Sequence, residues 1–123
     1  MKSFEELECW KTARELRREV SRITKIFPLE EKYKLVDQML RCSRSVTANI
    51  AEGFGKFYTK DNVRYCRSAR GSLYELKDHF IVALDEGYIK EEEYENKKNE
   101  IDTCLKILNG FINYLNNAEI SRK

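Results

Sequence analysis

Apolar residues return every three or four positions along almost the whole chain. Between Phe4 and Phe27 they form one continuous stripe, which is typical of one face of an amphipathic α-helix. The same spacing resumes after Pro28, after Gly55 and after Gly87. We therefore predict four helices, at about residues 4–27, 29–54, 60–86 and 90–117. No stretch shows the two-residue alternation of a strand, so the predicted fold class is all-α.

Proline and glycine mark the breaks between these helices. Pro28 stops the first helix and suits the first turn of the second. Gly53 and Gly55 predict a helix end or a close backbone approach, and Gly87 is expected to cap the third helix. Gly71 lies inside the apolar seam of the third helix, where glycine is costly. We therefore expect a neighbouring helix to cross closely at Gly71.

The connections between these helices are short. Helices of some 30–40 Å joined by short links pack as antiparallel neighbours, which predicts an up-down-up-down four-helix bundle. The length of 123 residues suits one domain, residues 1–123. In this topology the link between the second and third helices lies at the same end as both termini.

Cysteine usage and hydropathy exclude several classes of protein. The four cysteines fall one per predicted helix and form no CxxC pair, so they are expected to be reduced apolar fillers. No apolar run approaches the roughly 20 residues that a bilayer span needs, and a signal-peptide core is lacking. We expect a cytoplasmic protein without a membrane segment, a metal or a cofactor.

Charge is distributed unevenly although the net charge is only +2. Residues 41–70 contain two acidic residues, whereas residues 85–95 contain six acidic residues and one lysine. Basic side chains on one end of a bundle suit phosphate contacts, and nearby Phe57, Tyr58 and Tyr65 suit stacking on bases. The predicted nucleic-acid-binding residues are Arg41, Arg44, Lys56, Lys60, Arg64, Arg67 and Arg70. The alternative is that the arginines pair with acids of a neighbouring subunit.

A second polar set occupies the two middle helices. Asn49 and Glu52 lie one turn apart on one helix, and Ser72 and Glu75 lie one turn apart on the next. Across an antiparallel pair these couples can face each other. One interpretation is a small polar site or a catalytic carboxylate pair. The interpretation that we adopt is a hydrogen-bonded network that fixes helix register, with Arg41 or Arg70 as further partners.

His79 is the only histidine. It lies four residues after Glu75, but a di-iron bundle needs two Glu-x-x-His motifs and two further glutamates. The sequence contains no glycine-rich phosphate loop and no HExxH motif. We therefore expect a protein that is not an enzyme and binds no metal.

Three stretches carry a family resemblance: FEELECWKTARELRREV, FPLEEKYKLVDQMLRCSRSVTANIAEGFGKF and ARGSLYELKDHFIVALDEGYI. They resemble the four-helix-bundle proteins that are encoded in intervening sequences of bacterial 23S rRNA genes. The sharpest pieces are NIAEGFGK at 49–56 and ARGSLYEL at 69–76. Cys42 departs from the pattern, because the family usually has alanine there, and this change is expected to affect packing only.

The resemblance implies a bundle that assembles as a ring-shaped homo-oligomer, a homopentamer. Members also occur outside rRNA genes, and related, more basic bundles are accessory proteins to reverse transcriptases. The predicted function is that of a non-catalytic oligomeric bundle associated with RNA or DNA. The alternative is a protein scaffold or adaptor, such as an accessory subunit to a reverse transcriptase. A hydrolase that uses Glu52 and Glu75 is the third hypothesis.

Overall fold

The computed structural model describes residues 2–121, so the outermost residues of the domain expected over 1–123 lie outside it. Four α-helices follow one another along the chain, and three short 3-10 turns accompany them near the N-terminus and the first connection. The helices are α1 (Glu8–Ile23), α2 (Leu35–Phe54), α3 (Thr59–Asp85) and α4 (Glu91–Ser121). The turns are η1 (Phe4–Glu6), η2 (Thr24–Ile26) and η3 (Leu29–Glu31). Since residues 2–121 contain no β-strand, the all-α prediction is confirmed.

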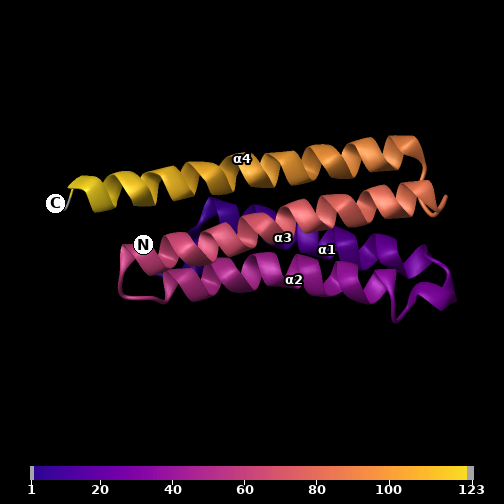
Figure 1. Ribbon diagram of the computed structural model, residues 1–123, viewed down its shortest axis with the longest axis horizontal. Coiled ribbons are helices and arrows are strands. Elements are labelled where there is room, and N and C mark those ends of the chain that lie inside the picture. The colour runs from indigo at the N-terminus through magenta and orange to yellow at the C-terminus, as the bar shows by residue number, and fades with distance from the viewer. Residues whose placement is uncertain (1, 122–123) are drawn as a thin grey trace.

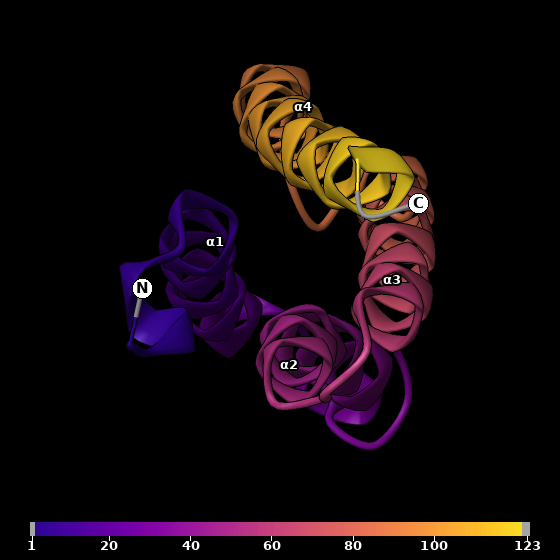
Figure 2. The same ribbon diagram turned by 90° about the vertical axis from the view of Figure 1, so that its left-hand side faces the viewer.

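Each helix runs antiparallel to the one before it along the chain (Figure 1). Both termini lie at the same end as the α2–α3 link, as the topology predicts, and the other two links lie at the far end (Figure 1). Viewed from the end, the helices form an arc in which α4 lies beside α3 and α1 lies beside α2 (Figure 2). The α2–α3 interface is the most extensive of the bundle, and the α1–α4 interface is the smallest of the four.

The predicted apolar stripes form the core. Its largest fully buried side chains are Phe80, Met39, Ile50, Leu73 and Leu76. All four cysteines are buried and unpaired, as expected of apolar fillers. Within residues 2–121 no helix combines the length and the hydrophobicity needed to cross a bilayer.

The first helix is interrupted, in contrast to the continuous helix expected over 4–27. Leu7 adopts an extended backbone, with φ −72° and ψ 128°, between η1 and α1. This kink turns the Leu7 side chain into the core. At the other end Thr24 Oγ1 donates a hydrogen bond to Val20 O at 2.8 Å, and the helix tightens into η2. Such side-chain bonds to the backbone compete with a regular helix.

The second helix starts later than the sequence pattern indicates. Residues 29–31 form η3, and α2 begins only at Leu35. A tertiary contact holds this turn, because Tyr88 Oη donates to Glu31 Oε2 at 2.7 Å from the α3–α4 link. Glu31 Oε1 also accepts a bond from Leu35 N at 3.4 Å. The fourth helix in turn extends to Ser121, beyond the end expected near residue 117.

Three glycines test the predictions about breaks and crossings. Gly87, with φ 77°, ends α3, and Tyr88 N donates to Ala83 O at 2.9 Å, as in a Schellman cap. A Cβ at Gly53 would lie 2.7 Å from Asn62 Oδ1, which confirms a close approach of α2 to α3. A Cβ at Gly71 would meet nothing within 4 Å. The expected close crossing at Gly71 is therefore wrong, because this glycine faces outward.

Candidate nucleic-acid interface

The link between α2 and α3 presents two aromatic rings to solvent. Phe57 is 89% exposed and Tyr58 is 66% exposed, and their ring centroids lie 5.0 Å apart in an edge-to-face pair. Gly55 ends α2 and Tyr58 precedes α3 with an extended backbone, so the link turns outward at the end of the bundle. Two adjacent aromatic side chains that bury so little apolar area are typical of a contact surface.

Basic side chains follow these rings along the chain. Lys60, Arg64 and Arg67 follow one another on the first turns of α3, where they line a groove of about 550 Å³. Asn116 and Glu119 of α4 form the opposite side of this groove. We call the combined patch the corner surface, which consists of Lys56, Phe57, Tyr58, Lys60, Arg64 and Arg67.

Two of the four cations on the corner surface have acidic partners. Arg64 pairs with Asp61 at 2.6 Å, and Lys56 pairs with Glu52 at 4.0 Å. Both pairs are exposed, and exposed pairs of this kind contribute little to stability, so a ligand can compete for them. Lys60 and Arg67 form no ion pair within residues 2–121.

The other three predicted arginines do not join the corner surface. Arg41 pairs with Asp37 at 2.9 Å and lies roughly 20 Å from the end of α2, at 1.5 Å per residue. Arg70 donates to Asn109 Oδ1 at 2.9 Å, in a partly buried contact with α4. Arg44 faces α1. The sequence analysis expected the seven basic residues to gather at one end of the bundle. That expectation is wrong for Arg41, Arg44 and Arg70.

Arg44 contributes to a second basic groove, of about 480 Å³, between α1 and α2. Its other lining residues include Phe4, Trp10, Arg17 and Thr47, and none of the described lining residues is acidic. Arg17 Nη1 donates to Thr47 Oγ1 at 2.9 Å. The sequence analysis selected neither Arg17 nor Trp10 as a site residue. Their spacing of seven residues, two helical turns, was the signal that places them on one face.

The predicted polar network exists in part. Asn49 Nδ2 donates to Ser45 Oγ at 3.0 Å, and the Ser45 and Ser72 hydroxyls lie 3.0 Å apart across the α2–α3 interface. Ser45, which the sequence analysis did not select, connects the two predicted members. Arg41 and Arg70 bond elsewhere and take no part.

The two carboxylates of the predicted set do not face each other. Glu52 pairs with Lys56, and Glu75 Oε2 lies 3.1 Å from His79 Nε2. Gly53, next to Glu52, contacts Asn62 of α3, which places the two carboxylates roughly 18 Å apart along the bundle. The geometry therefore supplies no catalytic carboxylate pair.

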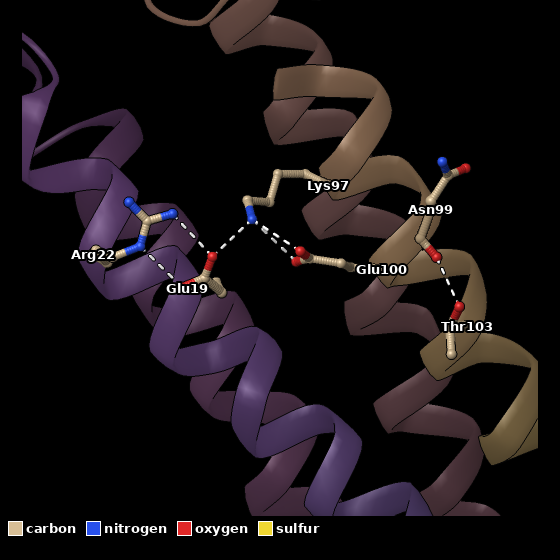
Figure 3. A network of polar contacts seen from close by, with 6 residues as sticks. All are labelled: Glu19, Arg22, Lys97, Asn99, Glu100 and Thr103. Carbon is tan, nitrogen blue, oxygen red and sulfur yellow. Dashed lines mark hydrogen bonds and ion pairs between the residues drawn. The ribbon is translucent and has the colours of Figure 1, made fainter. Parts of the chain in front are cut away.

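A buried ion pair connects α1 to α4 (Figure 3). Lys97 is 6% exposed, and its Nζ donates to Glu19 at 2.9 Å and to Glu100 at 3.0 Å. Glu19 also accepts two bonds from Arg22, both at 2.9 Å. The hydrogen bonds from Arg22, and then those from Lys97, lower the pKa of Glu19 to about 2. The cluster is fully partnered and serves the fold.

Comparison with known proteins agrees with this fold. The family model described as 23S rRNA-intervening sequence protein matches residues 5–110. A protein of unknown function from the S23 ribosomal protein family of Bacteroides thetaiotaomicron VPI-5482 has a similar crystal structure. The TM-score is 0.79 at 23% identity, over 85% of this chain and 95% of that chain. No curated protein matches the sequence.

Proposed function

We propose a function from one premise: the chain belongs to the 23S rRNA-intervening sequence protein family. The proposed function is binding of RNA or DNA through the corner surface, without catalysis. The observation that carries it is the exposed pair Phe57 and Tyr58, followed on the first turns of α3 by Lys60 and Arg67, two cations without an ion pair within residues 2–121.

This combination suits an unpaired strand of nucleic acid. Cations contact the phosphate backbone, and flat aromatic rings stack on bases of any sequence. A duplex hides the base faces, so the exposed rings favour single-stranded segments. Four unpaired cysteines suit a reducing compartment, and the proposal therefore includes a cytoplasmic location.

Charge reversal at the corner surface tests this proposal. In the Lys60→Glu/Arg67→Glu variant, affinity for a labelled single-stranded RNA is expected to fall at least about tenfold at low salt, because two phosphate contacts become repulsive. The slope of log affinity against log salt is expected to decrease by about 2, one for each contact. Fluorescence anisotropy across a salt series measures both quantities.

The matched control reverses two exposed cations away from the corner surface, Arg18 of α1 and Lys25 of η2, in the Arg18→Glu/Lys25→Glu variant. This control has the same net charge, so it separates a local contact from general attraction. Equal losses of affinity in both variants would contradict binding at the corner surface. A wild-type protein that binds neither RNA nor DNA at low salt would contradict the proposed function itself.

A second candidate function, a protein adaptor, has its own structural support. A largely apolar groove of about 630 Å³ lies between the start of α1 and the second half of α4. Its apolar lining residues include Leu7, Phe54, Ile107, Phe111, Tyr114 and Leu115, and Glu6, Glu8 and Asn62 also line it. An apolar segment of a partner protein, such as a polymerase of the reverse-transcriptase class, would fit such a groove. A complex with such a partner that survives nuclease treatment, together with absent nucleic-acid binding, would favour the adaptor.

We further propose that the chain forms a homo-oligomer, a pentamer as the family resemblance implies. Support comes from large apolar side chains that are exposed away from the corner surface: Ile26, Leu29, Tyr33, Tyr74, Ile81 and Val82. Burial of such residues between subunits is a common source of assembly energy. Light scattering after size exclusion is expected to give five times the chain mass of 14.6 kDa. A monomer across the accessible concentration range would contradict this proposal.

A further inference from the structure

Three side chains of types that bind metal ions converge between α2 and α3. Cys42 Sγ, a carboxylate oxygen of Glu75 and a ring nitrogen of His79 all lie within 4.8 Å of one another. This is the one group of at least three potential ligands from His, Cys, Asp and Glu that the described part of the chain contains. In a tetrahedral zinc site the ligand atoms lie about 3.3–3.7 Å from one another, which follows from the metal–ligand bond lengths. The observed spacing therefore needs only small side-chain movements.

The helix pair holds these ligands in place before any ion binds. Glu75 and His79 are separated by four residues and therefore share one face of α3. Cys42 lies opposite them on α2, where its Sγ donates to Ser72 O at 2.9 Å. The hydrogen bond between Ser45 and Ser72, one turn along α2, fixes the register of the same two helices. The α2–α3 interface is also the most extensive in the bundle.

The cluster is buried on one side and open on the other. Cys42 is buried and the His79 side chain is 13% exposed, whereas the Glu75 side chain is 61% exposed. An ion can therefore enter past Glu75, and a water molecule can complete its coordination from the solvent side. Three protein ligands and one water are the usual arrangement of an open zinc site.

We propose that Cys42, Glu75 and His79 bind one zinc ion per chain. A thiolate, an imidazole and a carboxylate are the donor set that Zn²⁺ accepts, whereas Mg²⁺ and Ca²⁺ require oxygen ligands. The site is independent of the proposed nucleic-acid function, since it lies on the middle of the α2–α3 pair and not at the corner surface.

Zinc binding would change the chemistry of Cys42. Without a metal, burial and the neighbouring carboxylate of Glu75 raise the pKa of the Cys42 thiol to about 12, so the thiol is neutral and donates to Ser72 O. A bound dication displaces the thiol proton to solvent and leaves a thiolate ligand. The sequence analysis expected no metal because no cysteine belongs to a CxxC pair and a single histidine cannot complete a di-iron bundle. Cys42 lies 33 residues before Glu75, so no local metal motif contains both.

Cobalt titration of the full chain without an affinity tag tests the site. Co²⁺ replaces Zn²⁺ in such sites, and a thiolate-to-cobalt charge-transfer band in the near ultraviolet reports a bond to cysteine. The band is expected to saturate at one Co²⁺ per chain and to disappear when Zn²⁺ is added. Excess Zn²⁺ is expected to raise Tm, because the ion binds the folded chain more tightly than the unfolded one.

Three variants make the result decisive. Cys42→Ala is expected to abolish the band, and His79→Gln is expected to weaken binding at least about tenfold. Cys104→Ala removes another buried thiol, one outside the cluster, and is expected to keep both the band and the affinity. His79 is partly exposed, so its variant tests the site even if Cys42→Ala folds poorly. No saturable binding at millimolar Co²⁺, or binding that Cys42→Ala and His79→Gln leave unchanged, would overturn the proposal.

Discussion

Replacing Gly53 by valine is expected to lower the free energy of unfolding by about 2–3 kcal/mol, since the new side chain overpacks a closed interface. Even the first added carbon would lie 2.7 Å from Asn62 Oδ1, 2.9 Å from Tyr65 Cβ and 3.1 Å from the backbone oxygen of Asn62. A side-chain oxygen can move away, but a Cβ and a carbonyl move only with the helix. Valine therefore separates the end of α2 from the start of α3, and the expected fall in Tm is roughly 10 °C.

Gly71→Ala is the matched control, with the opposite expected sign. Gly71 also lies within a helix, but a Cβ there meets nothing within 4 Å. Alanine removes the cost of glycine in a helix, so the free energy of unfolding is expected to rise by about 0.5–1 kcal/mol. Urea unfolding followed by circular dichroism measures both variants. A Gly53→Val variant as stable as the wild type would contradict the close approach that the structure shows.

These two glycines illustrate what the sequence can predict and what it cannot. The cost of glycine in a helix is local, so both positions are recognisable as unusual from the sequence alone. Which of them faces a neighbouring helix depends on the rotation of α3 about its axis, a property of tertiary packing. The prediction was therefore right for Gly53 and wrong for Gly71.

The helix boundaries show the same division between local and tertiary causes. The cap at Gly87 consists of two local bonds, from Gly87 N to Leu84 O and from Tyr88 N to Ala83 O, so its role could be predicted from the sequence. The late start of α2 depends on the bond from Tyr88 to Glu31, which joins residues 57 positions apart. No pattern within residues 29–34 contains that information.

The candidate sites differ in how well the sequence predicts them, and the reason is related. The corner surface is nearly continuous in sequence, from Lys56 to Arg67, so charge counting located it. Arg41, Arg44 and Arg70 have the same charge, but their positions along and around the helices direct them to other neighbours. The cluster of Cys42, Glu75 and His79 requires the register of two helices, which the sequence analysis did not determine.

The Lys97→Ala variant is expected to lose about 2–3 kcal/mol of stability, with Lys98→Ala, at the next position on α4, as its matched control. Lys97 is a lysine in an apolar stripe, between Tyr94 and Ile101, and its ammonium group bonds Glu19 and Glu100. Removing one partner of a buried ion pair is costly, because the remaining charges lose their compensation. The partial exposure of both glutamates reduces this cost below that of a fully buried pair.

The control position differs from Lys97 in its partners. Lys98 forms no ion pair within residues 2–121, so Lys98→Ala is expected to change stability by less than about 0.5 kcal/mol. The comparison is informative because the α1–α4 interface is the smallest of the four. Equal stability of Lys97→Ala and the wild type in urea unfolding would contradict a structural role for the cluster in Figure 3.

Acid is expected to remove the stabilisation that this cluster gives to the folded chain. The pKa of Glu19 is lowered to about 2 in the folded chain, first by Arg22 and then by Lys97, from an ordinary value of 4.5. A carboxyl group whose pKa is lower in the folded chain than in the unfolded chain stabilises the folded state at pH values above its unfolded pKa. This stabilisation is lost as pH falls from about 5 toward 2. The stability gap between the wild type and Lys97→Ala is therefore expected to be full at pH 7 and to narrow progressively below pH 5. A gap that stays constant down to pH 2 would mean that Lys97 stabilises the bundle through its buried aliphatic stem and not through its charge.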